Sequence, residues 1–549
     1  MEFDPVLVHE WLTATSRKLP NKIALVSRGK RLTYRMIEEQ SSRLASGLIS
    51  LGLQRGQRAV ICLENSPEAV ISIYAILKAG GVFVVIDPKT PLPILSSILS
   101  DAESSILITD NRRLQAKEGL KAPGPDFIVI IVDGHRGLTH SHLKALSWTQ
   151  LIEKAQLPAR FPRLLDTDLA CLIYTSGSTG NPKGIICTHR NMVAAARSII
   201  QYLENTQDDV ILDVLPLSFD YGLYQIIMCF MFGGTVVLEP SLGYLEDIIT
   251  SIEKEKVTGF PIIPTISAMM LRLKKFPVER LKSLRYITNT GAAWPVSHIR
   301  QLRGLLPRVK LYSMYGLSEC KRVSYLPPEL IDKYPESVGI PIPNLEVAIV
   351  DRWGKPVPPG KTGQLLVRGP MVMQGYWRDD ELTKKVFRNG LYPEERWLST
   401  GDLFRQDENG LLYFVGRFDR QIKSFGLRVN LAEIERVISS LNEVSEVAAI
   451  PFPDELGGEV VGVFVVKKKE SRLDEKRLRQ LCQQQLEPHK IPRYIWFVDS
   501  LPKTANGKIN YRLIISLPTY RKEKIETGHE EHLMRQAGFG GEKPKAKSS

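Results

Sequence analysis

The stretch DLACLIYTSGSTGNPKGI, residues 168–185, joins an apolar run to a loop of glycines, hydroxyl side chains and one lysine. The apolar run predicts a buried strand that ends near Tyr174. Glycines let backbone N–H groups approach an anion closely, and hydroxyls and a lysine donate further hydrogen bonds, so the loop has the chemistry of a phosphate site. It is neither a Walker loop, because Lys183 is followed by Gly184, nor a GxGxxG fingerprint. Taken alone, such a loop is more often a simple connection.

The pattern on both sides of this loop predicts an α/β fold. Between residues 20 and 350, short β-branched runs closed by Gly, Pro, Asn or Asp alternate with amphipathic helical stretches, which is typical of layers built on largely parallel sheets. Turn signals at 353–354 and 358–360 predict a small antiparallel β subdomain. We expect a large N-terminal α/β domain over 1–418, a small mobile α+β domain over 419–516 and a disordered tail over 517–549.

Composition narrows the function classes. The chain has 549 residues, and Lys and Arg outnumber Asp and Glu by 73 to 60. The basic clusters lack interleaved aromatics and zinc-finger spacing, which argues against nucleic acid. The six cysteines are scattered, which argues against a zinc site or disulfide framework and for a reducing compartment. With no apolar run near ~20 residues and no signal-peptide pattern, we expect a cytoplasmic protein without a membrane span.

Further motifs follow the loop in a fixed order. They are MYGLSE at 314–319, TGD at 400–402, GRFDRQIKSFGLRVNLAEIE from Gly416, and PKTANGK at 502–508. Together with TSGSTGNPKG they resemble the adenylate-forming superfamily, which contains acyl-CoA synthetases, amino-acid adenylation domains and luciferases. The resemblance covers roughly residues 10 to 515. It departs from the family pattern at Ser318, where threonine is usual.

The resemblance implies ATP and Mg²⁺ as cofactors and assigns roles to particular residues. The loop would hold the departing pyrophosphate, Glu319 and Thr179 would hold the metal, Asp402 the ribose hydroxyls, and Lys508 the carboxylate and the α-phosphate. Lys423 would lie on a loop presented in the second half-reaction. The residues expected to contact ATP or AMP are Thr175, Ser176, Gly177, Ser178, Thr179, Gly180, Lys183, Gly291, Ala292, Ala293, Met314, Tyr315, Gly316, Ser318, Asp402, Arg417 and Lys508.

A second half-reaction requires a thiol to reach the carbonyl of the adenylate. A small separate domain that carries Lys508 can rotate, remove the lysine and present another face. The resemblance places the hinge at Asp419 and the path of the pantetheine arm at Gly426. The alternative for Asp419 is an ordinary turn aspartate.

The acid is indicated by LPLSFDYGLYQ, residues 215–225. Asp220 precedes an apolar helical run, so it is either an N-cap or, as in amino-acid-activating relatives, the partner of a substrate ammonium. We expect Phe219, Asp220, Tyr224 and Cys320 to contact the substrate. Tyr221, Trp294 and Lys321 are expected to border the same pocket, whose bulk favours a small or cyclic acid. RVNLAEIE resembles the amino-acid adenylation pattern, although Asn430 departs from it.

These motifs predict an AMP-forming carboxylate–thiol ligase. The favoured version loads an amino acid onto the phosphopantetheine of a carrier protein, and the alternative is an acyl- or aryl-CoA ligase. The charge balance cannot choose between CoA and a carrier protein, and the chain could be a monomer or a homodimer. More remote alternatives are a luciferase-like oxygenase and a catalytically silent adenylate-binding scaffold.

Overall fold

The structure is a computed structural model. It describes residues 4–114, 120–133, 144–157, 160–176, 182–390, 392, 394–417, 420–424, 427–454, 458–469, 471–486, 490–504, 507–515 and 517. The chain divides into two compact units. The first unit contains Met1–Ala348, Leu366–Thr400 and Asp407–Tyr413, and the second contains Ile349–Leu365, Gly401–Gln406 and Phe414–Ser549. The domain boundary after residue 418 and the mobility of the C-terminal domain over 419–516 remain predictions. All but residue 517 of the predicted disordered tail lies outside the described residues.

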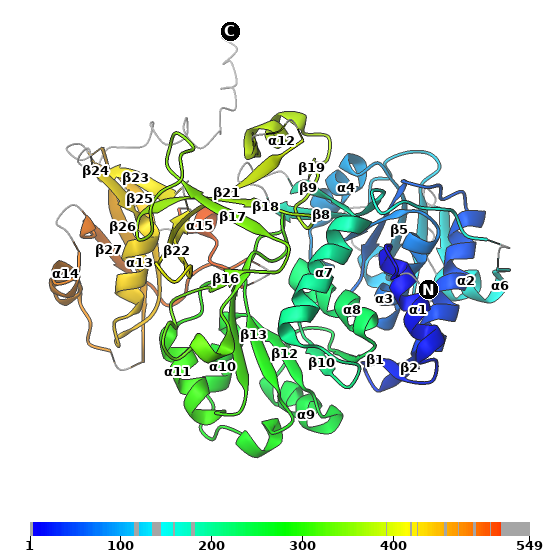
Figure 1. Cartoon of the computed structure of the whole chain (residues 1–549), viewed down its shortest axis with the longest axis horizontal. Coiled ribbons are helices and arrows are strands. Elements are labelled where there is room, and N and C mark those ends of the chain that lie inside the picture. The colour runs from blue at the N-terminus through cyan, green and yellow to red at the C-terminus, as the bar shows by residue number, and fades with distance from the viewer. Residues whose placement is uncertain are drawn as a thin grey trace, which may run out of the picture. The chain divides into compact units, whose positions relative to one another are not determined.

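Two large sheets build the first unit (Figure 1). One sheet runs in the order β19-β9-β8-β4-β3-β5-β6-β7. Its strands are β3 (Arg58–Cys62), β4 (Val82–Val85), β5 (Ser104–Thr109), β6 (Ile128–Ile131), β7 (Lys144–Ser147), β8 (Leu169–Ser176), β9 (Pro182–Thr188) and β19 (Gly375–Tyr376). Strands β3 to β8 pair in parallel along this order, as predicted from their continuous apolar runs.

The other sheet runs in the order β16-β15-β14-β13-β12-β10-β11-β1-β2. Its strands are β1 (Ile23–Ser27), β2 (Lys30–Thr33), β10 (Val210–Asp213), β11 (Thr235–Leu238), β12 (Gly259–Ile262), β13 (Tyr286–Asn289), β14 (Lys310–Tyr315), β15 (Ser324–Tyr325) and β16 (Ile340–Pro341). The central strands are again parallel, and the ends of the sheet are antiparallel.

Helices cover these sheets. They are α1 (Val8–Lys18), α2 (Tyr34–Ser50), α3 (Pro67–Lys78), α4 (Leu92–Asp101), α5 (Asn111–Leu114), α6 (Trp148–Lys154), α7 (His189–Leu203), α8 (Asp220–Phe232), α9 (Leu245–Glu255), α10 (Pro264–Leu271), α11 (Val296–Leu305) and α12 (Asp380–Val386). Helix α7 packs on β8 and β9, α8 packs on β10 and β11, and the two helices contact each other (Figure 1). This shared layer joins the loop hairpin to the strand that precedes Asp220.

Helix α8 is apolar on every side and almost wholly buried, as its sequence predicts for a core helix. It ends at Gly233, whose φ of +82° is the left-handed conformation that favours glycine at a helix end. Strand β11 follows at once, so the predicted buried helix and strand separated by Gly233-Gly234 are confirmed.

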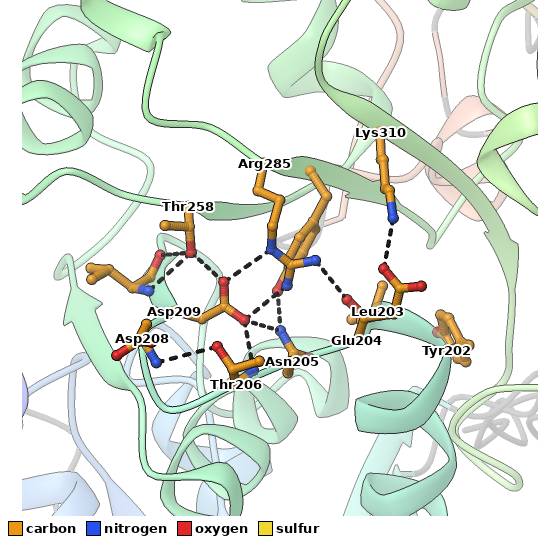
Figure 2. A network of polar contacts seen from close by, with 12 residues as sticks. Tyr202, Leu203, Glu204, Asn205, Thr206, Asp208, Asp209, Thr258, Arg285 and Lys310 are labelled. Carbon is orange, nitrogen blue, oxygen red and sulfur yellow. Dashed lines mark hydrogen bonds and ion pairs between the residues drawn. The ribbon is translucent and has the colours of Figure 1, made fainter.

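A polar network fixes the loops at one end of the second sheet (Figure 2). The buried Asp209 carboxylate accepts hydrogen bonds from Arg285 at 2.8 Å, from the Thr258 hydroxyl at 2.7 Å and from the Thr206 amide at 3.0 Å. Burial raises the pKa of Asp209, but the Arg285 guanidinium and these donors lower it overall. Asp209, Thr258 and Arg285 directly precede β10, β12 and β13. The Asp209 carboxylate therefore links the ends of the loops that lead into these three strands.

The second unit has its own sheet and core. Its sheet runs in the order β24-β23-β26-β25, with β27 paired to β26. The elements are β23 (Gln421–Ser424), β24 (Leu427–Asn430), α13 (Leu431–Ser439), β25 (Val444–Asp454), β26 (Gly458–Lys467), α14 (Glu475–Gln483), β27 (Tyr494–Phe497) and α15 (Tyr511–Ile514). Helix α13 buries Ile434 and Ile438 in an apolar cluster with residues of β25 and β26. The predicted α+β composition of this segment is confirmed.

A further sheet runs in the order β17-β18-β21-β20, with β22 paired to β21. Its strands are β17 (Glu346–Val350), β18 (Thr362–Arg368), β20 (Phe387–Asn389), β21 (Arg396–Gln406) and β22 (Leu412–Arg417). The predicted turn at 353–354 is present, since the Asp351 amide donates to the Lys355 carbonyl at 2.8 Å.

All six cysteines are free and buried. In the part of the chain that the structure describes, no helix has the length and hydrophobicity needed to cross a bilayer.

Candidate functional site

The glycine- and hydroxyl-rich loop is carried by an antiparallel hairpin. Strands β8 and β9 pair so that Thr175 lies opposite Lys183 and Ser176 opposite Pro182. The sequence predicted β8 but not β9, because the return strand begins inside the polar motif. Residues 177–181 between the strands, among them Gly177, Ser178, Thr179 and Gly180, lie outside the described residues. The structure therefore positions both ends of the loop.

Lys183 and Glu319 are brought together by a residue that the sequence did not predict. Tyr376 on β19 pairs with Ile185 on β9, and the Lys183 ammonium lies 6.0 Å from the centroid of its ring. The Tyr376 hydroxyl donates a hydrogen bond of 2.9 Å to Oε1 of Glu319. The Met373 amide also holds the Glu319 carbonyl at 2.8 Å. The Lys183 ammonium and the Glu319 carboxylate therefore both lie beside the Tyr376 side chain.

This arrangement fits a magnesium ion bound with phosphate. Mg²⁺ uses one or two carboxylates together with phosphate and water oxygens. Glu319 is half-buried, and the Tyr376 hydrogen bond engages Oε1, so Oε2 is the oxygen suited to a cation.

The turn after β14 explains the glycine of MYGLSE. A Cβ on Gly316 would lie 2.3 Å from the Lys321 carbonyl oxygen, a separation that no side chain tolerates. Lys321 has a φ of +66°, and its ammonium donates to the Ser318 carbonyl at 2.5 Å. Met314 is buried before the turn, and Tyr315 is half-buried at the end of β14. The chain therefore folds back tightly on itself, and Glu319 lies in the loop.

The expected base-binding loop follows β13. Gly291 has a φ of +88°, and a Cβ there would lie 3.7 Å from the Phe219 ring. Asn289 donates to the Ala292 carbonyl at 3.5 Å, and Ala292 and Ala293 are exposed. The structure thus brings Phe219, a predicted substrate residue, beside the loop predicted to line the nucleotide base.

The remaining predicted substrate residues share a buried environment. Burial raises the pKa of the Tyr224 hydroxyl. Electrostatic interactions with Cys187, Asp220 and Cys320 raise this pKa further. That hydroxyl has no hydrogen-bond partner among the described residues. Burial lowers the pKa of Lys321, but Cys187 and Asp220 outweigh it and raise the pKa above its usual value. Tyr224 and Lys321 therefore lie within electrostatic range of Asp220, and the contact of Tyr224, Cys320 and Lys321 with a substrate remains a prediction.

Asp220 is not an N-cap. Helix α8 begins at Asp220 itself, the capping position is Phe219, and no side chain caps the helix. Asp220 is only 8% exposed, and its carboxylate accepts no hydrogen bond from another described residue. The capping alternative is therefore wrong, because the helix starts one residue earlier than an Asp220 cap requires.

In the second unit, Asp402 and Arg417 form an ion pair with 3.2 Å between Oδ1 and Nη1. Asp402 is buried on β21, whereas Arg417 ends β22 and is exposed. Gly401 has a φ of +74°, and a Cβ there would lie 3.2 Å from Nη2 of Arg417. The TGD glycine thus permits the approach of an arginine to the aspartate.

Lys508 closes a tight turn in the same unit. Its carbonyl accepts from the Thr504 amide at 2.7 Å and its amide donates to the Thr504 hydroxyl at 3.2 Å. Lys423 lies on β23 opposite Arg428. Asn430 caps α13 by accepting from the Ala432 amide at 2.9 Å, which gives this departure from the family pattern a local structural reason. Asp419 and Gly426 lie outside the described residues.

Models of two protein families and several curated proteins match this sequence. The model of the AMP-binding enzyme family matches residues 12–377, and that of the AMP-binding enzyme C-terminal domain matches residues 433–508. A long-chain-fatty-acid–CoA ligase of Bacillus subtilis is 30% identical over 92% of this chain and 94% of the ligase. Bacitracin synthase 1 of Bacillus licheniformis is also 30% identical over 92% of this chain. The chain spans only 9% of that synthase.

Solved structures agree with these families. An anthranilate CoA ligase, AuaEII, in complex with anthranoyl-AMP has a TM-score of 0.84 at 26% identity, covering 95% of this chain and 99% of the ligase. o-Succinylbenzoate CoA synthetase from Bacillus subtilis, in complex with ATP and magnesium ion, has a TM-score of 0.78 at 26% identity, covering 91% and 98%. The predicted fold class is confirmed, and ATP is confirmed as the nucleotide that the family uses. With family models over most of its length, this chain belongs to the AMP-binding enzymes and is an adenylate-forming, AMP-dependent ligase.

Proposed function

We propose that this ligase uses ATP and Mg²⁺ to adenylate a small amino acid and then transfers the aminoacyl group to the phosphopantetheine thiol of a carrier protein. The observation that carries the choice of acid is the Asp220 carboxylate. It is buried, it caps no helix, and no described residue donates a hydrogen bond to it. A buried carboxylate is costly unless a partner compensates it. A substrate ammonium would be that partner.

The first half-reaction forms a bond between a carboxylate oxygen and the α-phosphorus and breaks the bond to pyrophosphate. Lys183 and the loop ends would bind the departing phosphates, where negative charge accumulates. Glu319, oriented by Tyr376, would hold Mg²⁺, which neutralises phosphate oxygens when bound. Asp402 would accept from the ribose hydroxyls while Arg417 orients it. Lys508 would supply a mobile positive charge between the carboxylate and the α-phosphate.

The second half-reaction transfers the acyl group from AMP to sulfur. A thiolate attacks the carbonyl carbon, and AMP leaves as its α-phosphate takes the bonding electrons. In this proposal the segment around Asp419 is the hinge, Gly426 lies on the path of the pantetheine arm, and Lys423 is on the face presented after rotation. The protein is expected to act in the cytoplasm, where ATP and carrier proteins or CoA are available.

An acyl- or aryl-CoA ligase is the second candidate. Lys321 favours it, because its ammonium already lies in the electrostatic range of Asp220 and offsets part of the negative charge. Similarity over nearly the whole length of a long-chain-fatty-acid–CoA ligase points the same way. The bulky and polar side chains around Asp220 argue against a long aliphatic chain.

The test is pyrophosphate exchange measured with amino acids and with their analogues that lack the amine. We expect faster exchange with the amine present, and loss of that preference in Asp220→Asn. Asp213→Asn is a matched control, since Asp213 is also buried and burial raises its pKa, which disfavours the charged form. Equal use of acids with and without the amine would reject the amino-acid proposal in favour of the CoA ligase. Oxygen uptake with light emission would indicate the luciferase-like alternative. Absence of pyrophosphate exchange with any acid would indicate the catalytically silent scaffold.

A further inference from the structure

Arg322 is a buried cation without a matching anion. It is 4% exposed, and its Nε and Nη1 atoms have no hydrogen-bond partner among the described residues. Its guanidinium carbon lies 5.0 Å from the centroid of the Tyr221 ring. The ring itself is fixed, because the Tyr221 hydroxyl donates to the Thr288 carbonyl at 3.0 Å. The guanidinium is therefore held on a rigid aromatic surface while two of its nitrogens lack acceptors.

No described acid compensates this charge. Arg322 forms no ion pair with another described residue. Asp213 acts electrostatically on Tyr221, but burial raises the pKa of Asp213 and so disfavours its charged form. A stacking interaction with one ring offsets only part of the cost of burying a guanidinium. An anion that arrives with a ligand would supply the missing acceptors.

The position of Arg322 points to the acid substrate. Arg322 directly follows Lys321 in the chain, and Tyr221 directly follows Asp220. The two segments interact, because Arg322 lies on the Tyr221 ring and Lys321 interacts electrostatically with Asp220. Lys321 is engaged by the Ser318 carbonyl and by Cys187. Arg322 also interacts with the Tyr202 side chain, but it is the cation of this cluster whose Nε and Nη1 donors have no partner among the described residues.

We propose that Arg322 binds a second carboxylate of the substrate, at the end opposite the carboxylate that is adenylated. This inference rests on the proposed function and specifies its substrate as an amino acid with an acidic side chain. Asp220 would hold the ammonium, and Arg322 would donate a charge-assisted hydrogen bond to the distal carboxylate from one of its two unmatched nitrogens, Nε or Nη1. Arg322 would act in substrate selection and not in the bond-forming step.

Four five-carbon acids separate the two contacts. Glutamate carries both the amine and the second carboxylate, glutarate only the carboxylate, norvaline only the amine, and pentanoate neither. The same design is repeated with the four-carbon and six-carbon acids to allow for pocket length. In pyrophosphate exchange, we expect the second carboxylate to raise kcat/KM by at least about tenfold, the order of one charge-assisted hydrogen bond.

Matched variants assign each contact. Arg322→Met, which keeps an unbranched side chain but removes the guanidinium and its charge, should abolish the gain from the second carboxylate and retain the gain from the amine. Asp220→Asn should do the opposite. If only the amine effect is absent, the amino-acid proposal fails, while the binding of a second substrate carboxylate by Arg322 stands. If the second carboxylate gives no gain at any chain length, or the gain survives Arg322→Met, the Arg322 proposal is overturned.

Thermal unfolding supplies a readout that does not need turnover. Because Arg322 is an unpaired buried charge, Arg322→Met should keep or raise the Tm of the free protein, and glutamate or glutarate should raise the Tm of the unaltered chain but not of the variant. A large loss of Tm in Arg322→Met, with the same ligand-induced shift as the unaltered chain, would show that the arginine is structural and would overturn the proposal.

Discussion

Tyr376→Phe removes one hydroxyl and leaves the ring beside Lys183 in place. The hydroxyl donates a 2.9 Å hydrogen bond to the Glu319 carboxylate. A hydrogen bond to a charged group contributes about 1.5–3 kcal/mol, and the half-buried setting of both residues places this one near the lower end. Since about 1.4 kcal/mol corresponds to a factor of ten, we expect kcat/KM for Mg·ATP to fall about tenfold.

The assay is pyrophosphate exchange at a saturating acid concentration, with Mg²⁺ and ATP varied. Tyr413→Phe is the matched control, because the half-buried Tyr413 donates a similar bond of 3.0 Å to the Asp407 carboxylate. Neither residue of that pair belongs to a predicted motif. An unchanged dependence on Mg·ATP in Tyr376→Phe, or an equal loss in Tyr413→Phe, would refute the idea that Tyr376 orients a metal-binding Glu319.

Three further predictions concern stability and the nucleotide site. Asp209→Ala should lower the free energy of unfolding by about 3 kcal/mol, because it leaves the half-buried Arg285 and the Thr258 and Thr206 donors without their acceptor. Glu204→Gln at an exposed ion pair should cost under about 1 kcal/mol, and urea midpoints check both values. His9 and His189 have pKa values lowered by burial, that of His189 to about 4, so the unfolded chain binds more protons below pH ~6.5 and stability should fall between that pH and about 4. His9→Phe, which keeps the edge contact between the rings, should weaken the pH dependence of the urea midpoint. Gly401→Ala should raise KM for ATP severalfold, since φ is +74° and the added Cβ meets an arginine; an unchanged KM would argue against this close approach.

Much of the fold could be predicted because burial on both faces leaves a strong pattern in the sequence. Strands β5, β6 and β8 each contain a run of apolar residues, and the split between α8 and β11 is marked by Gly233-Gly234. Strand β19 could not be predicted, because its two residues, Gly375 and Tyr376, carry no periodicity and are defined only by pairing with β9. Tertiary contact, not local sequence, forms that strand.

In the candidate site, too, local sequence patterns predicted some residues, and only tertiary contact defines the others. Motifs identified Lys183, Glu319, Asp402 and Lys508 because each lies in a recognisable local pattern. Tyr376 contacts Glu319 from 57 residues away, so no local pattern predicts that hydrogen bond.

Arg322 was missed for a different reason. It follows the YGLSE motif closely, but a basic residue in a chain with 73 lysines and arginines carries no signal until its burial and unmatched nitrogens are known. The capping alternative for Asp220 was wrong by one residue of register, whereas its contact with a substrate amine remains a prediction. A single residue decides whether an aspartate caps a helix or begins it, and helix ends are predictable only to within a few residues.

The central claim is that a carboxylate attacks the α-phosphorus of ATP with the help of Lys508. The most direct test identifies the nucleotide product and measures acid-dependent pyrophosphate exchange in the unaltered chain, in Lys508→Ala and in Lys503→Ala. Lys503 is the control, since its ammonium pairs with Glu446 at 2.9 Å. We expect AMP and pyrophosphate in equal amounts, with exchange lost only in Lys508→Ala while ATP binding persists. Formation of ADP, or normal exchange in Lys508→Ala, would contradict the account.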